Sequence, residues 1–171
     1  MKTDPAILLL VPRLIEALRH ELHQYGEMLA LLDQQQEQVM GRAADEVLHS
    51  AVAINDQMAV LQLARRQREA CQGEVARALH QPEETTFVHL IPQLPEQYRS
   101  AVEALVRENN ELLTRVQRRG RQNHVLLSRS LEMMQRFMST LLPASPPTVY
   151  NGEGHLHPAS PQTQPIYEAV G

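Results

Sequence analysis

Between residues 13 and 40, apolar residues recur at alternating steps of three and four, which is the spacing of a coiled-coil heptad. The positions of this stripe, one of them polar, are Ile15, Leu18, Leu22, Tyr25, Leu29, Leu32, Gln36 and Val39. Residues such as Arg19, Glu21 and Glu27 occupy the other faces. The pattern predicts an amphipathic helix of about 42 Å at 1.5 Å per residue, which Gly41 ends.

A second helical pattern covers residues 45–80, and Asp45 is suited to cap its start. Its stripe is thin, because Ala and Met stand where the first stripe has Leu, and Arg68 lies on it. A thin stripe buries little apolar area, so this helix needs neighbours on both sides. Residues 81–94 form a connector in which one short turn, residues 87–91, is expected to cover an end of a bundle.

The third helical pattern, residues 95–142, is the longest. Its apolar stripe begins with Val102, Leu105, Asn109, Leu112 and Val116. Two successive four-residue steps between Leu112 and Gly120 predict a stutter near Val116, and the polar stretch from Gly120 to Asn123 predicts a weak stretch of core. The stripe resumes beyond these residues, although neither earlier helix is long enough to cover it.

Residues 143–171 differ from the rest of the chain, because they are rich in Pro, Ser and Gly and have no helical period. Such a segment cannot bury enough apolar surface to offset chain entropy, so we expect it to be disordered when free. The patterns together predict an all-α fold. We expect an elongated antiparallel helical bundle or coiled coil of three long helices in residues 1–142, followed by a disordered C-terminal tail.

The amino-acid composition supports a helical protein and indicates in which cellular compartment it resides. Aromatic residues make up only 4% of the chain, which disfavours an all-β fold because strands are enriched in them. The single cysteine, Cys71, excludes an internal disulfide and a Cys-based zinc site. The apolar run 6–11 is too short for a signal peptide, and no stretch approaches the roughly 20 apolar residues of a membrane span. We therefore expect a cytoplasmic protein without direct membrane insertion.

The sequence carries no motif that indicates an enzyme. It has neither a glycine-rich phosphate loop nor a nucleophile elbow, so we expect no catalytic residues and no cofactor. His20, His23 and Glu27 have a spacing that can hold a metal, and His155 and His157 form a weak chelating pair. A solvated helix face is the favoured interpretation of the first group, and we expect no metal.

A cluster of arginines lies in the middle of the third helix. Its members are Arg115, Arg118, Arg119, Arg121 and Arg129. A site for single-stranded nucleic acid would combine such a cluster with aromatic residues, but none lies nearby and the net charge is −4. A solvated face or an acidic partner is therefore favoured over nucleic acid. Three arginines of the second helix, Arg65, Arg66 and Arg68, could extend this basic zone. Alternatively, they could pair with Glu108 or Glu111 across helices.

The densest apolar stretch of the chain lies at the end of the third helix. It contains Leu126, Leu127, Leu131, Met133, Met134, Phe137, Met138, Leu141 and Leu142. This stretch can be part of the bundle core. Its methionines and its phenylalanine, at the end of a helix without a matching partner, equally suit an adaptable surface for a helix of another chain.

Two adjoining segments carry a specific signature. Residues 121–142 read RQNHVLLSRSLEMMQRFMSTLL and contain an Asn-x-x-Leu-Leu motif at residues 123–127. Residues 147–154 read PTVYNGEG, which is Pro-Thr-aliphatic-Tyr followed by a Gly–acidic–Gly run. Together they resemble the last helix and the tail motif of the FlgN family of flagellar export chaperones, and residues 29–68 resemble the family's first hairpin. Gly120 stands where many members carry a second Asn.

The resemblance implies a non-enzymatic chaperone that binds the C-terminal helical segments of the hook-associated proteins FlgK and FlgL. It would prevent their premature assembly and deliver them to the export gate protein FlhA. In the family, the last helix contacts the cargo. Carried over, the cargo-binding residues are Leu126, Leu127, Leu131, Met134, Phe137, Met138 and Leu141. The tail tyrosine docks on FlhA, which carries over to Tyr150, whereas Tyr167 inherits no role.

Other functions fit parts of the same sequence. A structural coiled-coil scaffold would form a stable homo-oligomer in which the apolar stretch of the third helix is already covered. A nucleic-acid binder that uses the arginine cluster would lose affinity steeply as the salt concentration rises. A cargo-free chaperone could itself pair as a homodimer through its exposed apolar stretch.

Overall fold

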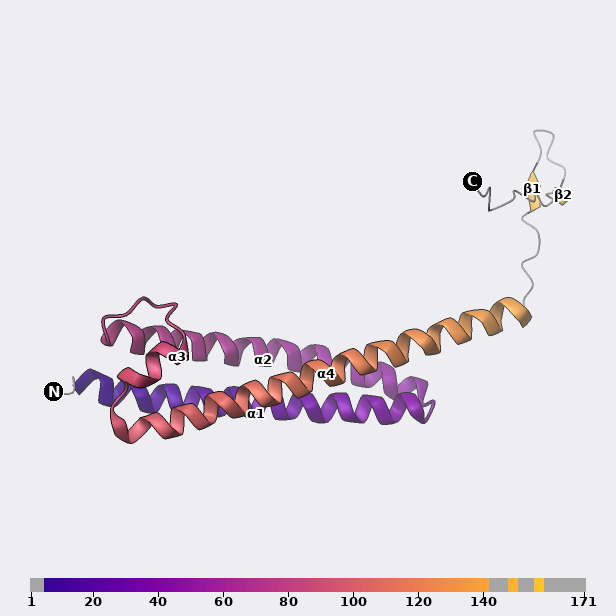
Figure 1. The fold of residues 1–171 in the computed structure, drawn as a ribbon. Coiled ribbons are helices and arrows are strands. Elements are labelled where there is room, and N and C mark those ends of the chain that lie inside the picture. Colours follow the sequence, from indigo (N-terminus) through magenta and orange to yellow (C-terminus); the bar gives the residue numbers. More distant parts are fainter. Residues whose placement is uncertain (1–4, 142–147, 151–155, 159–171) are drawn as a thin grey trace, which may run out of the picture. The chain divides into compact units, whose positions relative to one another are not determined.

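The computed structural model describes residues 5–141, 148–150 and 156–158, and the chain divides into two compact units, Met1–Leu127 and Ser128–Gly171. The helices are α1 (Pro5–Met40), α2 (Ala44–Ala78), α3 (Phe87–Leu90), the 3-10 helix η1 (Ile91–Gln93) and α4 (Glu96–Leu141); the strands are β1 (Thr148–Tyr150) and β2 (Leu156–Pro158) (Figure 1). The prediction of a helical fold is confirmed. The predicted count of three helices was wrong, because the described residues contain a fourth, α3.

The first helix begins earlier than its apolar pattern predicts. Pro12 lies inside α1, where it removes one backbone hydrogen bond and is expected to bend the helix. Its neighbours Ile7, Val11 and Leu14 are buried in the core. Burial of these side chains outweighs the local cost of the proline, so the helix continues through it.

Both long helices of the first hairpin end in the same backbone motif. After α1, the amide of Arg42 bonds the carbonyl of Val39, and after α2 the amide of His80 bonds the carbonyl of Arg77. In each case the amide of the next residue also donates to the carbonyl five residues before it, and the two bonds together form a Schellman motif. The left-handed residues are Arg42 and His80, each with φ of 57°. The predicted stop at Gly41 is confirmed, because α1 ends at Met40, and the left-handed residue is the following Arg42.

The start of α2 also differs from the expectation. The residue before the helix is Ala43, whose side chain cannot cap it, and Asp45 lies within the first turn. An acidic side chain there interacts favourably with the helix dipole but does not form the predicted cap.

Helix α2 returns antiparallel along α1 (Figure 1). Near one end of the hairpin, the guanidinium of Arg13 lies 2.9 Å from the carboxylate of Glu74. Further along, Nε2 of Gln57 donates to the carbonyl of Gln24 at 3.1 Å. Residues later in α1 therefore contact residues earlier in α2, as expected for antiparallel helices.

Helix α4 runs parallel to α1, and two buried asparagines set the register. Nδ2 of Asn109 donates to the carbonyl of Leu18 at 3.1 Å, and Nδ2 of Asn123 donates to that of Leu32 at 2.7 Å. In both pairs the two residues are 91 positions apart in sequence. The register is therefore the same before and after Val116, so the predicted stutter near Val116 is wrong. Asn123, in the predicted weak stretch, is fully buried.

Two apolar clusters hold the first unit together. The larger combines buried residues of α1, α2, the connector and α4, namely Ile7, Val11, Leu14, Ile15, Leu18, Val75, Ala76, Leu90, Leu94 and Val102. Phe87 and Ile91 pack against it, so the prediction that this connector segment covers the bundle is confirmed. The smaller cluster is built from Tyr25, Met28, Leu32 and Leu61, with Leu112, Leu113 and Val116 of α4 packed against them.

The second unit contains residues 128–141 of α4 and the two strands. Strand β1 pairs antiparallel with β2, with Tyr150 opposite Leu156. The predicted disorder of residues 143–171 concerns positions that lie mostly outside the described residues, as do His155 and Tyr167. None of the described helices combines the length and the apolar character that a membrane span requires.

Candidate functional site

The C-terminal part of α4 carries a dense set of large apolar side chains in contact with solvent. Their exposed fractions are 60% for Leu131, 69% for Met133, 60% for Met134, 61% for Phe137 and 49% for Met138. All residues from 131 to 140 are exposed. Single exposed apolar residues are ordinary, but a contiguous group of this kind is typical of an interaction surface. We refer to residues 131–138 as the apolar segment of α4.

The register between α1 and α4 gives a physical reason for this exposure. Within the first unit, the offset of 91 residues matches Leu127 of α4 to Gln36 of α1, and α1 ends four residues later at Met40. Helix α4 continues for 14 residues beyond Leu127, to Leu141. The heptad stripe nevertheless continues, since Phe137 lies two heptads after the buried Asn123. A heptad stripe that continues without a partner helix from the same chain is suited to bind a helix of another molecule.

The predicted cargo-binding residues fall into different environments. Leu126 and Leu127 are half-buried and belong to the first unit, whereas Leu131, Met134, Phe137 and Met138 are exposed. Leu141 is the last residue of α4, and its side chain lies outside the described part. Met133 is as exposed as its neighbours, although it was not among the predicted contacts.

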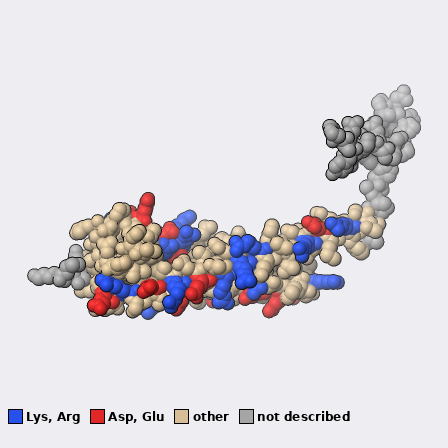
Figure 2. Space-filling view, in the orientation of Figure 1, with Lys and Arg blue, Asp and Glu red and all other residues tan. Residues whose placement is uncertain are grey.

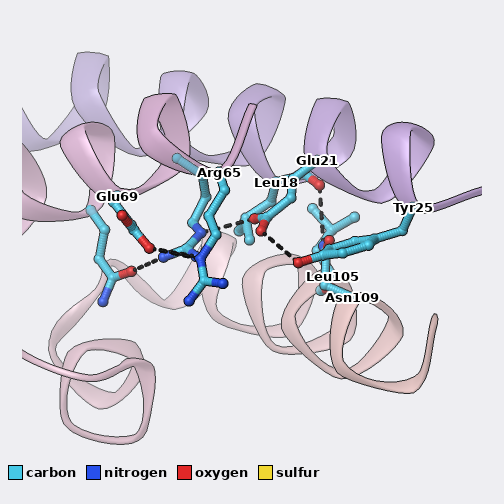
Figure 3. A network of polar contacts seen from close by, with 9 residues as sticks. Leu18, Glu21, Tyr25, Arg65, Glu69, Leu105 and Asn109 are labelled. Carbon is cyan, nitrogen blue, oxygen red and sulfur yellow. Dashed lines mark hydrogen bonds and ion pairs between the residues drawn. The ribbon is translucent and has the colours of Figure 1, made fainter. Parts of the chain in front are cut away.

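A buried polar network joins α1 to α2 inside the first unit (Figure 3). The Glu21 carboxylate, 3% exposed, accepts from Nε of Arg68 at 2.9 Å and from the Tyr25 hydroxyl at 3.2 Å. Arg65 lies beside it and pairs with Glu69 at 3.0 Å. Burial, followed by the negative charge of Glu21 and the hydrogen bond to it, raises the pKa of Tyr25. The network holds a charged pair in the bundle without leaving the carboxylate unpaired.

This network corrects two sequence-based expectations. Glu21 was assigned to an outer face of its helix but is buried. Pairing with Glu108 or Glu111 was one of two alternatives for the arginines of α2, yet Arg68 pairs with Glu21 and Glu69. The signal was present in the sequence, because an arginine on the apolar stripe of α2 requires an acidic partner on the facing helix.

A model of the FlgN protein family matches residues 1–158. The chain belongs to the FlgN family. Its members are chaperones of flagellum assembly, so membership indicates a protein that binds flagellar proteins. No curated protein and no solved structure matches the chain significantly.

The residues that the family model matches include both predicted contact regions of this FlgN-family chain. Residues 1–158 include the apolar segment of α4 and also Tyr150, the last residue of β1. The predicted docking role of Tyr150 stays a prediction.

The arginine cluster of the FlgN-family chain has an acidic partner within the chain itself. Nε of Arg119 lies 2.5 Å from the carboxylate of Asp33 on α1, and its guanidinium also contacts Gln36. Arg115 and Arg118 line the same cavity of about 220 Å³ as Asp33. Basic and acidic side chains alternate over the visible face of the bundle (Figure 2). The mixture resembles an ordinary charged helix surface more than a continuous basic groove.

The histidines proposed as metal candidates lie on the solvated face of α1. Nε2 of His23 is 4.0 Å from the carboxylate of Glu27, and both side chains are exposed. Within the described residues, no group of three or more His, Cys, Asp or Glu side chains is placed to hold a metal ion. His155, one half of the tail pair, lies outside the described residues.

Proposed function

We propose that this FlgN-family chaperone binds the C-terminal helical segments of FlgK and FlgL through the apolar segment of α4. The observation that carries the proposal is the exposure of five large apolar side chains within residues 131–138. Three of them are methionines, whose flexible thioether chains adapt to more than one partner surface. An amphipathic cargo helix would cover them and continue the heptad stripe.

Binding at this surface would also keep the cargo from assembling early. The helical segments of FlgK and FlgL would be occupied by α4, so they could not pack with their assembly partners until they are released. The family resemblance supports delivery of this complex to FlhA, with Tyr150 as the docking residue. A single aromatic ring on a tail gives a specific but reversible contact, which suits cargo release. We place this cycle in the cytoplasm.

Co-purification of the full chain with C-terminal fragments of FlgK and FlgL tests the cargo site. The variants Leu131→Asp and Phe137→Asp should weaken binding at least about 30-fold, equivalent to about 2 kcal/mol, because a charge would replace a buried apolar contact. Leu63→Asp is the matched control. Leu63 is a leucine on α2 with 56% exposure, close to the 60% of Leu131. Its substitution should leave cargo binding unchanged.

Two outcomes would contradict this assignment. If neither fragment forms a complex with the unmodified chain, cargo binding of this kind is excluded. If Leu63→Asp and Leu131→Asp weaken binding equally, the cargo site is not confined to the end of α4.

Secretion of FlgK and FlgL in living cells tests the docking residue separately. Tyr150→Ala should lower secretion of both proteins while cargo binding in vitro stays unchanged. Tyr167→Ala provides the control, since it removes the other tail tyrosine outside the family motif. Equal secretion by Tyr150→Ala and the unmodified chain would remove the docking role and leave the cargo site untouched.

A further inference from the structure

Helix α2 is apolar on two opposite faces. Its inner face buries residues such as Leu61 and Ala64. At about 100° per residue, Leu48, Val52 and Leu63 lie on the opposite side, where their exposed fractions are 68%, 64% and 56%. A helix that is apolar on both sides is typical of one packed between two neighbours. The bundle supplies a neighbour for the inner face only.

The ends of this outer face carry opposite charges. Asp45 and Glu46 lie in the first turn of α2, while Arg65 and Arg66 follow the last apolar residue of the face. Between these ends the only charged residue is Asp56. Within the described chain, Asp45 and Arg66 form no ion pair.

The positions on this face are self-complementary about a point between Asn55 and Asp56. Two identical α2 helices can pair antiparallel around a two-fold axis that passes this point. Each contact between two different residues then occurs twice, once on each side of the axis. The pairs are Leu48 with Leu63, Val52 with Ala59 and Asp45 with Arg66. All six side chains are exposed and lie on the outer face. A parallel pair would instead bring Asp45 against Asp45 and Arg66 against Arg66.

We propose that a second copy of this chain docks antiparallel on the outer face of α2 and forms a two-fold homodimer. The apolar side chains supply the central contact, and the acidic start of each helix faces the basic end of its partner. The proposal is independent of cargo binding, because it uses α2 and leaves the apolar segment of α4 free. It places dimerisation on a different surface from the apolar stretch of α4 that the sequence suggested.

The size of the face sets the expected strength. Residues 45–66 span about 33 Å of helix, and two such helices bury less than the roughly 1,600 Å² of a typical stable interface. The homodimer should therefore dissociate on dilution, and its average mass should rise with protein concentration.

Sedimentation equilibrium of the full chain over a wide concentration range tests the surface. Leu63→Asp should raise the dimer dissociation constant at least tenfold, because it places a charge in the central contact of both helices. Leu131→Asp, on the exposed part of α4, should leave it unchanged. A chain that stays monomeric at all concentrations would overturn the proposal, and so would loss of the dimer in Leu131→Asp alone.

Charge exchange tests the antiparallel register. Asp45→Arg and Arg66→Glu should each weaken association, since each creates two like-charge contacts. The double variant Asp45→Arg/Arg66→Glu should restore it, because the exchanged charges again face opposite partners. If the double variant associates more weakly than either single variant, the proposed pairing is incorrect.

Disulfide trapping gives an independent geometric test in a Cys71→Ser background. Asn55→Cys should yield a covalent dimer on oxidation, because position 55 lies beside its own symmetry mate at the axis. Arg66→Cys should not, since the two positions 66 would lie about 31 Å apart along the helices. Trapping of both variants to the same extent would indicate a parallel pair and overturn the proposal.

Discussion

At the scale of single residues, the buried asparagines of α4 fix its register at a cost in stability. Nδ2 of Asn109 donates to the carbonyls of Leu18 and Leu105, but its Oδ1 is buried and has no partner in the described chain. A buried acceptor without a partner costs about 1–3 kcal/mol. A polar residue in a coiled-coil seam typically restricts the register in exchange for stability.

We therefore expect Asn109→Leu to raise the free energy of unfolding by about 1 kcal/mol, as measured by urea denaturation. A cavity of about 340 Å³ beside Asn109 leaves room for the larger side chain. Asn123→Leu should gain less, because the buried Gln35 would lose the amide donor that Asn123 provides at 3.2 Å. Destabilisation by Asn109→Leu would show that its Oδ1 is in fact satisfied, for example by water.

The raised pKa of Tyr25 predicts a pH dependence of stability. In the unfolded chain a tyrosine ionises with a pKa of about 10, whereas burial and the negative charge of Glu21 hold the pKa of folded Tyr25 higher. The resulting stability is fully present below pH 10 and is lost as the pH rises through the folded pKa. Urea denaturation at pH 9 and pH 11 should show a smaller loss in Tyr25→Phe than in the unmodified chain. Equal losses would mean that another group causes the alkaline destabilisation.

The heptad pattern put Asn109 and Asn123 on the stripe of α4, but it left Glu21 on an outer face of α1. Glu21 lies outside the apolar stripe of α1. Its carboxylate can be buried because Arg68 of α2 donates a hydrogen bond to it. Asn123 is a polar residue on the apolar stripe of α4. It is buried there, and its side-chain amide donates a hydrogen bond to the carbonyl of Leu32. Both placements depend on partners distant in sequence.

At the scale of helices, the apolar periodicity predicted the long elements well, because each buried stripe recurs with the helical period. Val102, Asn109 and Val116 lie on the predicted stripe and contribute to the seam with α1. The helix ends were predicted less well. The pattern began the first helix at residue 13, whereas α1 begins at Pro5 and includes Pro12, and the pattern gave no sign of the left-handed Arg42.

The two left-handed helix ends give a prediction at this scale. Arg42 and His80 hold φ of 57°, a conformation that costs a residue with a Cβ about 1 kcal/mol relative to glycine. Thermal unfolding should show that Arg42→Gly and His80→Gly each stabilise the chain by about 1 kcal/mol. Ala51→Gly, at an exposed position in the interior of α2, is the opposite control and should destabilise the chain by a similar amount. A loss of stability in both left-handed variants would mean that these side chains make contacts worth more than the backbone strain.

At the scale of the whole chain, the contacts that stabilise the bundle and the surface proposed for cargo lie in different parts of the sequence. Both apolar clusters, both asparagine bonds and the Glu21–Arg68 pair lie within residues 1–127. The exposed apolar side chains of α4 lie within residues 131–138 and contribute to neither cluster. Stability and cargo binding should therefore be separable.

A chain shortened after Leu127 tests this separation. Its free energy of unfolding in urea should stay within about 1 kcal/mol of the full chain, because the new end frays only the last turn of α4. It should still self-associate through α2, yet it should no longer bind the FlgK and FlgL fragments. Non-cooperative unfolding of the shortened chain would show that residues beyond 127 contribute to the bundle. Retained cargo binding would instead place the cargo surface on the half-buried Leu126 and Leu127 or elsewhere in the first unit.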